Sequence, residues 1–203
     1  MSLDALMHDL MNLPASSTAF NPYVYDAQRT NLARYLRYAQ ERGDGVMMVL
    51  EAPGYRGCRL TGIPVTSRQV MLEGVPALQA FGAGYVDAPE VGFETYYREQ
   101  SATIVWGLLA RLNVLPLLWN AFPLHPHRAG MPASNRTPTL AEVAQGRALL
   151  AQVVALFAPR LVIAVGNVAH STLSALGVPC HKVRHPAQGG KQDFVAGTES
   201  ILG

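Results

Sequence analysis

The chain has 203 residues, of which 49% are hydrophobic, and its formal net charge is +2 at pH 7. A chain of this length buries roughly 70% of its unfolded surface, so we expect one α/β domain over residues 1–203 that needs no cross-links. Two cysteines are too few for a disulfide framework and lack the spacing of a zinc site. Neither a signal peptide nor an apolar run of about 18 residues is present, which favours a cytoplasmic protein without membrane attachment.

Four apolar segments are expected to form strands. The first, GVMMVL (45–50), stops at an EAPG turn, and the second is NVLPLLWN (113–120). Pro116 lies within the second and favours an edge position or a bulge. RLVIAVG (160–166) is the clearest strand because it is β-branched and bounded by proline and glycine, and CHKVRHP (180–186) is a weaker fourth.

Helical patterns alternate with these strands. Apolar and aromatic residues repeat at helical spacing over 26–42, 137–159 opens with Thr-Pro, and 169–177 ends on a glycine suited to a C-cap. This alternation predicts a parallel sheet with helices on both faces. No pattern could be assigned to an N-terminal extension (1–25) or to residues 74–105.

Basic residues are segregated from acidic ones along the chain. The windows 52–72, 121–141 and 181–192 contain no Asp or Glu. They hold 8 of the 16 basic residues: Arg56, Arg59, Arg68, Arg128, Arg136, Lys182, Arg184 and Lys191. Each window follows an expected strand, and ligands of parallel sheets bind beyond the carboxyl ends of the strands. The three windows are therefore expected to converge and to bind an anionic partner.

Three polar residues at these strand ends are candidates for chemistry. Glu51, among arginines, is expected to be ionised and either to orient a water or only to pair with Arg56. The amide of Asn120 either reads the edge of a nucleobase, for which it has a donor and an acceptor, or stabilises a turn. His185, beside Arg184, is expected to stay neutral and to donate one hydrogen bond to a developing anion.

Other motifs favour less specific roles. His125 and His127 form an HxH pair without a further nearby ligand, which is weak support for a metal site. GNVAHS (166–171) more readily makes a turn and a helix cap than a phosphate site. GxxxxGK[ST], GxGxxG and GxSxG do not occur in the chain, so no bound cofactor is expected.

The ordered motifs resemble those of the uracil-DNA glycosylase superfamily, closest to the bacterial and archaeal branch whose first motif reads GEAPG. The similarity covers about residues 45–190. Besides LEAPG (50–54) and Asn120 at a strand end, four segments of the chain correspond to family motifs. TGIP (61–64) corresponds to TGxPF, NRTPTLAEV (135–143) to NRxPTPEE, PRLVIAVGNVA (159–169) to PKVIVALGxxA, and HPA (185–187) to HPS.

The resemblance implies a three-layer α/β/α sandwich around a short, mainly parallel four-stranded sheet. It implies hydrolysis of the N-glycosidic bond of a damaged base flipped out of DNA, by a monomer. Glu51 would activate the attacking water, His185 would donate to the base carbonyl, and Asn120 would select the base. The phosphates would be gripped by the basic windows, among them Arg56, Arg59, Arg184 and Lys191.

The sequence also departs from the family pattern. Val65 stands where the family has a phenylalanine that stacks on the base, so the stack is lost or is supplied by Tyr55 or Phe122. Gly54 leaves open a position from which some relatives exclude a 5-methyl group. After His-Pro, Gln188 replaces the usual wedge leucine as the only nearby residue able to fill the vacated stack.

The matching branch binds an iron–sulfur cluster through four cysteines, but Leu124 and Gly146 occupy two of those places and no N-terminal CxxC exists. The leading hypothesis is thus a monofunctional glycosylase for uracil or another deaminated base, without metal or cluster. Two alternatives are a DNA-binding, damage-recognition module of the same fold with little turnover, and a hydrolase of free nucleosides or nucleotides.

Overall fold

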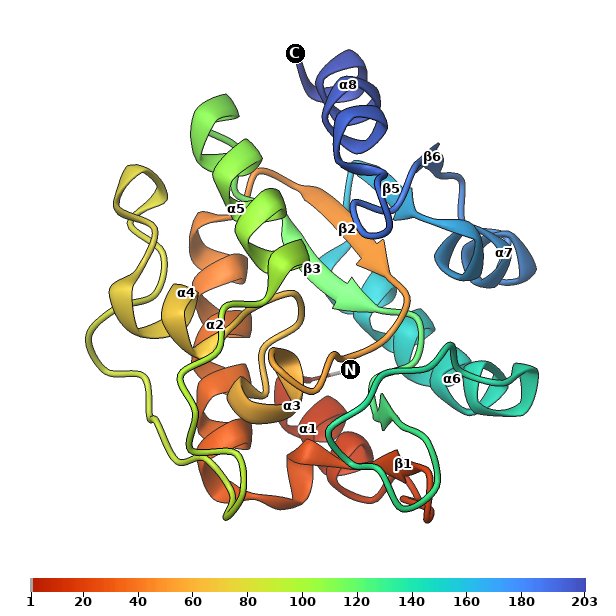
Figure 1. Cartoon of the computed structure of the whole chain (residues 1–203). Helices are drawn as coiled ribbons and strands as arrows, with labels where there is room; N and C mark the ends of the chain where they lie inside the picture. The colour runs from red at the N-terminus through yellow and green to blue at the C-terminus, as the bar shows by residue number, and fades with distance from the viewer. Residues whose placement is uncertain (1) are drawn as a thin grey trace.

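The structure is a computed structural model that describes residues 2–203 (Figure 1). Its centre is a four-stranded sheet with the order β3-β2-β5-β6, and every neighbouring pair is parallel. The strands are β2 (Val46–Leu50), β3 (Leu117–Asn120), β5 (Leu161–Val165) and β6 (His181–Val183). All four expected strands are confirmed. Pro116 directly precedes β3, which is an edge strand and tolerates the missing N–H.

Helices cover both faces of this sheet, which confirms the three-layer α/β/α sandwich. They are α1 (Leu3–Met11), α2 (Asp26–Arg42), α3 (Cys58–Thr61), α4 (Arg68–Glu73), α5 (Gln100–Leu112), α6 (Leu140–Phe157), α7 (Asn167–Ala175) and α8 (Lys191–Leu202). The chain enters β3 through α5 and then crosses back to β5 through α6. Because parallel crossovers are right-handed, these opposite steps place α5 on one face and α6 and α7 on the other, and α8 packs against α5 (Figure 1).

The hydrophobic core explains why the strands read as continuous apolar runs. All five residues of β2 are buried, as expected for a central strand covered on both sides. Among residues 2–203, only α6 has the length and mean hydropathy of a membrane span; it packs against α1, and Val143, Leu150 and Val153 on it are buried. Thr139 and Glu142 form a capping box that starts this helix.

The N-terminal segment, to which no role could be assigned from sequence, packs into the same core. Leu6 and Leu10 on α1 are fully buried, and α1 contacts α2 and α6. After it come β1 (Ala19–Phe20), which pairs antiparallel with β4 (His125–Pro126), and the 3₁₀ turn η1 (Pro22–Val24). Through the β1–β4 pairing, the N-terminal segment braces the loop that follows β3.

A second 3₁₀ turn, η2 (Pro76–Leu78), follows α4.

Candidate active site

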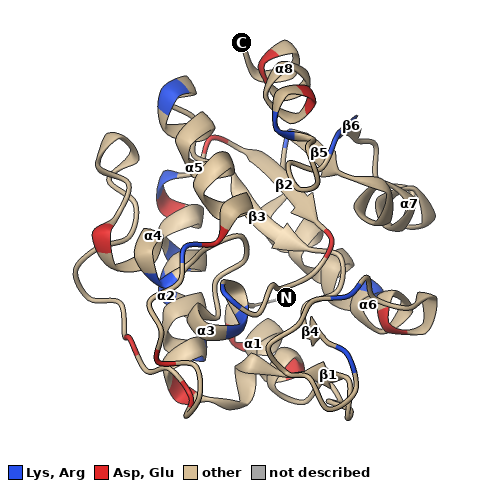
Figure 2. Cartoon of the chain, in the orientation of Figure 1, with Lys and Arg blue, Asp and Glu red and all other residues tan. Residues whose placement is uncertain are grey.

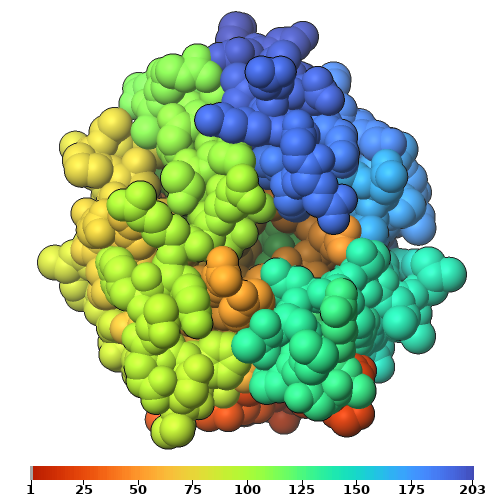
Figure 3. Space-filling model, in the orientation of Figure 1, coloured from red at the N-terminus to blue at the C-terminus, as the bar shows by residue number. Residues whose placement is uncertain are grey.

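A cavity of about 1280 Å³ opens at the carboxyl ends of the strands, where the space-filling view is hollowed (Figure 3). Its lining comes from residues 50–58, 65–66, 98–101, 120, 135–137, 166–168, 182–185 and 187–188. All three basic windows contribute to it, so their expected convergence is confirmed. Segments far apart in the chain meet here because parallel strands end at the same edge of the sheet.

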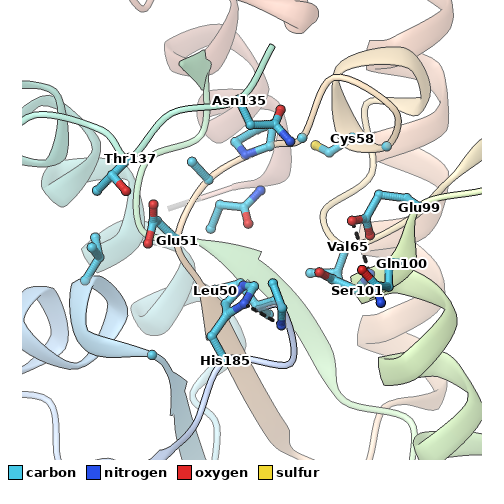
Figure 4. A pocket seen from close by; sticks show the side chains of 18 of the residues that line it. Leu50, Glu51, Cys58, Val65, Glu99, Gln100, Ser101, Asn135, Thr137 and His185 are labelled. Atoms are coloured by element: carbon cyan, nitrogen blue, oxygen red, sulfur yellow. Dashed lines mark hydrogen bonds between the residues drawn. The ribbon is translucent and has the colours of Figure 1, made fainter. Parts of the chain in front are cut away.

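Glu51 is the first residue after β2, and backbone hydrogen bonds hold it in place. Ala121 and Phe122 donate their N–H groups to the carbonyl oxygens of Leu50 and Glu51, at 2.8 and 3.0 Å, so the β2–β3 ladder extends beyond the strands. The half-buried carboxyl group faces Thr137 across the cavity wall (Figure 4). Burial raises the pKa of Glu51, and a hydrogen bond with the Thr137 side chain opposes this rise.

The alternative that Glu51 only pairs with Arg56 is wrong. Among residues 2–203 no Lys, Arg or His nitrogen forms an ion pair with the Glu51 carboxylate. The Arg56 guanidinium lies instead over the rings of Tyr55 and Tyr97. Glu51 is therefore a carboxyl group that lines the cavity and has no cationic partner.

His185 lies in the loop after β6 and its hydrogen bond fixes its tautomer. The Ala187 N–H donates to Nδ1 at 3.1 Å, so the proton of the neutral ring is on Nε2. Burial lowers the pKa of His185, and the charge of Arg184 lowers it further, which agrees with the expected neutral ring. Gly166, whose φ of 90° favours glycine, packs next to the His185 side chain.

Asn120 ends β3 with a buried amide that nothing in the described chain satisfies. The residue is 2% exposed, and its Nδ2 has no hydrogen-bond partner among residues 2–203. A buried donor without a partner costs about 1–3 kcal/mol, so such a group is kept where a ligand can accept its hydrogen bond. Because Asn120 also lines the cavity, this observation favours ligand reading over a turn-stabilising role.

Gly54 and Val65, both expected to surround the ligand, lie at the cavity with different constraints. Gly54 lines the cavity, and a Cβ added to it would meet only the Asn135 amide, at 3.7 Å, so a side chain there would fit. Val65 also lines the cavity, in the left-handed region at φ 55°, which is strained for a β-branched residue. Its carbonyl accepts a hydrogen bond from the Trp106 Nε1, at 2.8 Å, which helps to hold this conformation.

The aromatic candidates divide into one at the cavity and one in the core. Tyr55 lines the cavity, and its N–H donates to the Asn135 Oδ1 at 2.9 Å. Phe122 is fully buried and lines no part of the cavity, so the expectation that it stacks on a ligand is wrong. Phe122 lies two residues beyond the end of β3, where the strand alternation no longer applies, and its ring packs into the hydrophobic core.

The basic residues around the cavity are not equivalent. Arg56, Arg184 and Gln188 are exposed and line it, whereas Lys191 lines a shallower neighbouring cavity of about 310 Å³. Gln188 has a positive φ of 53° beside Gly189, which projects it from the tip of its loop. In Figure 2 the basic segments lie on several loops around the strand ends.

Arg59 was expected to bind an anionic partner at the surface, and the structure contradicts this. It is 3% exposed, and its guanidinium pairs with Glu90 at 3.0 Å. Nη1 lies 3.2 Å from the His125 Nδ1, and the group stacks between the rings of Phe20 and Phe93. Arg59 thus braces the loop region below the cavity. Arg68 and Arg136 are likewise paired, with Asp87 and Glu142.

Replacing Arg59 with methionine is expected to lower the free energy of unfolding by about 3 kcal/mol, because Glu90 would be left half-buried without a cation. Urea denaturation measures this change. Arg184→Ala is the matched control, since its side chain is exposed and the expected change is within about 0.5 kcal/mol. Equal losses in the two variants would contradict the bracing role.

The segment 98–101 contributes to the site although its sequence gave no assignment. Arg98, Glu99, Gln100 and Ser101 line the cavity at the start of α5 (Figure 4). Glu99 caps this helix, since its carboxylate accepts hydrogen bonds from the N–H groups of Ser101 (3.1 Å) and Ala102 (2.5 Å). An acidic cap before an apolar helical repeat is the signal that could have identified α5.

The remaining chemical candidates are engaged in packing. The His125 Nε2 lies 2.9 Å from the Ser134 carbonyl oxygen, and burial lowers the pKa of His125 to about 4. Within residues 2–203 no three His, Cys, Asp or Glu side chains gather as a metal site. Gly146 is pressed against the backbone after β3, where an added Cβ would lie 2.4 Å from the Ala121 oxygen, and Leu124 is fully buried. A cysteine would not fit at 146.

The family model of the Uracil DNA glycosylase superfamily matches residues 41–198. The match covers most of the chain and includes every strand of the parallel sheet and Glu51, Asn120 and His185. The chain belongs to this superfamily. No match was found among curated proteins.

Proposed function

We propose that this member of the Uracil DNA glycosylase superfamily is a monofunctional DNA glycosylase that removes uracil, or another deaminated base, from DNA. The observation that carries the proposal is the meeting of three groups in one cavity. They are an unpaired carboxyl group at Glu51, a neutral imidazole with its proton on Nε2 at His185, and an unsatisfied amide donor at Asn120.

These groups fit the steps of N-glycoside hydrolysis. The bond between C1′ and the base nitrogen breaks, its electron pair goes to the base, and water oxygen bonds to C1′. Glu51 as carboxylate takes the proton of the attacking water and offsets the positive charge that develops on the sugar. The His185 Nε2–H donates a hydrogen bond to a carbonyl oxygen of the base as negative charge develops there.

Selection of the base falls to the groups that meet its edge. The Asn120 amide offers a donor without a partner, and a base that accepts this hydrogen bond relieves a buried unsatisfied group. Gly54 leaves room beside the cavity wall, so a substituted pyrimidine is not excluded at that position. The exposed Arg56 and Arg184 contact phosphates and make binding salt-dependent.

Single-turnover cleavage of labelled oligonucleotides tests the proposal. Each oligonucleotide carries one uracil, hypoxanthine or xanthine, opposite each base or in a single strand. Release of at least one base by the wild type, with loss in Glu51 and His185 variants, is the expected result. No release from any of them, with salt-dependent binding retained, would leave a damage-recognition module. Turnover of free nucleosides that gains nothing from a longer strand would favour the small-molecule hydrolase.

A further inference from the structure

Tyr55 and Arg56, which line the cavity, form a cluster with Tyr97, which packs against both of them. The ring centroids of Tyr55 and Tyr97 are 6.1 Å apart and the rings meet edge to face at 70°. The Arg56 guanidinium carbon lies 5.1 Å from the centroid of Tyr55 and 4.9 Å from that of Tyr97. Arg56 is exposed and has no carboxylate partner within residues 2–203. The three groups are therefore within reach of a ligand at the rim.

The chemistry of this cluster suits an unpaired nucleobase. Aromatic rings bind bases by stacking, and arginine adds a cation–π contact, without regard to base identity because every base has a π-face. In a duplex, the faces of the bases are covered by their neighbours and cannot reach such a surface. The cluster therefore favours a strand whose bases are free.

A basic track leads away from the cluster. Arg98, the residue after Tyr97, lines both the main cavity and the shallower one, whose lining also includes Gln100, Thr103 and Lys191. No acidic residue lines the shallower cavity. Glu99, between Tyr97 and α5, has its carboxylate engaged by two backbone N–H groups. Arg56, Arg98 and Lys191 thus mark a route for one phosphate backbone past the cavity.

The opposite rim lacks the means to hold a duplex open. The loop Ala187-Gln188-Gly189-Gly190 presents no large apolar side chain, and its exposed tip is Gln188. Proteins that pull a base from a duplex fill the gap with an apolar wedge and offset the cost of unstacking. That cost is least for a base that is already unpaired.

We propose that Tyr55, Arg56 and Tyr97 form a stacking platform for an unpaired base, and that single-stranded DNA is the preferred ligand. The inference rests on the proposed function for the identity of the ligand as DNA. It concerns an undamaged base beside the flipped one, so the platform acts whether or not a damaged base is present. Tyr97 is a binding residue in this arrangement and not a catalytic one.

Binding of undamaged DNA tests the platform separately from excision. A fluorescein-labelled thymidine oligonucleotide and the duplex of the same sequence are titrated by anisotropy with the full chain carrying Glu51→Gln. Tighter binding of the single strand is expected. Adding Tyr97→Ala should weaken it by roughly 5- to 150-fold, as for loss of one base–aromatic stack, and leave duplex binding unchanged. Tyr97→Phe should bind as tightly as the parent.

Further variants separate stacking from a structural role. Tyr97→Leu keeps apolar bulk without a π-face and should lose single-strand binding at an unchanged Tm. Tyr25→Ala removes an exposed tyrosine whose ring stacks on Phe20 and not on Tyr55 or Tyr97, and it should have no effect. A 2-aminopurine in the strand should be quenched by the parent and not by Tyr97→Ala.

Equal affinity for duplex and single strand, or unchanged single-strand binding by Tyr97→Ala, would overturn the platform. Absence of excision together with Tyr97-dependent binding would instead remove the proposed glycosylase activity and keep the platform. Excision that is insensitive to Tyr97, with binding also insensitive, would keep the activity and remove the platform. The two proposals therefore fail by different results.

Discussion

Replacing Glu51 with glutamine is expected to lower the single-turnover rate of base release by about 10²- to 10⁴-fold, the usual contribution of a positioned general base. Glutamine keeps the size of the side chain and its contact with Thr137 but cannot take a proton from water. Because no other acid among residues 2–203 lines the cavity except Glu99, whose carboxylate caps α5, no neighbour can replace it. Rates are measured with enzyme in excess over labelled oligonucleotide.

The pH dependence of the same reaction reports the state of Glu51. Burial raises its pKa above the ordinary value of 4.5, and the carboxylate is the active form. The rate should therefore fall as the pH decreases through this raised pKa, and Glu51→Gln should lack that limb. Thr137→Val is a matched variant, because loss of the hydroxyl raises the pKa of Glu51 further and should shift the limb to higher pH. An unshifted limb would contradict the assignment of the titration to Glu51.

Glu51→Gln should also stabilise the fold at neutral pH. With a raised pKa, the folded state disfavours the charged carboxylate, and this penalty is full above the raised pKa and absent below the unfolded value. Glu51→Gln should therefore raise Tm by a few degrees at neutral pH and not in acid. Gain of stability with loss of rate is the signature of a group kept for function. A wild-type rate in Glu51→Gln would remove the assignment altogether.

The sheet and the position of the site could be predicted because they depend on local signals. Continuous apolar runs that end in glycine or proline identify strands, and the carboxyl ends of parallel strands share one edge. Glu51, Asn120 and His185 follow three such strands, so the sequence alone places them together. Helix α5 could not be predicted from a motif, because its start lies in a segment without strand or motif and its one signal is the Glu99 cap.

Pairing between distant residues could not be predicted in the same way. A window without acids at Arg59 suggested a free cation, but Glu90 reaches it from 31 residues further along the chain and neutralises it. Asp87 neutralises Arg68 from 19 residues away, whereas Glu142, which pairs with Arg136, lies only six residues further on, just past the end of its acid-free window. Phe122 was misplaced because neither composition nor spacing shows which side of a loop enters the core. The acid-free windows therefore predict where the site lies, but not how many of their basic residues remain without an acidic partner.

Replacing His185 with alanine is expected to lower the rate of base release by about 10²- to 10³-fold, the loss typical of one donor to a developing anion. The donor is Nε2–H, because the Ala187 N–H occupies Nδ1, and the ring needs no added proton to act. Burial and the charge of Arg184 lower its pKa below 6.5, which favours the neutral ring at neutral pH. The rate should consequently not fall as the pH rises above 6.5, whereas a protonated donor would lose activity there.

A glutamine at position 185 provides the control for this step. Its amide can donate a hydrogen bond without titrating, so His185→Gln should recover part of the rate that alanine loses. Asparagine is too short to reach as far from the loop and should recover less. Nitrogen chemical shifts of the His185 ring should show the proton on Nε2 and a pKa below 6.5. A ring protonated at neutral pH would contradict the neutral donor, and base departure would then depend on a full positive charge beside Arg184.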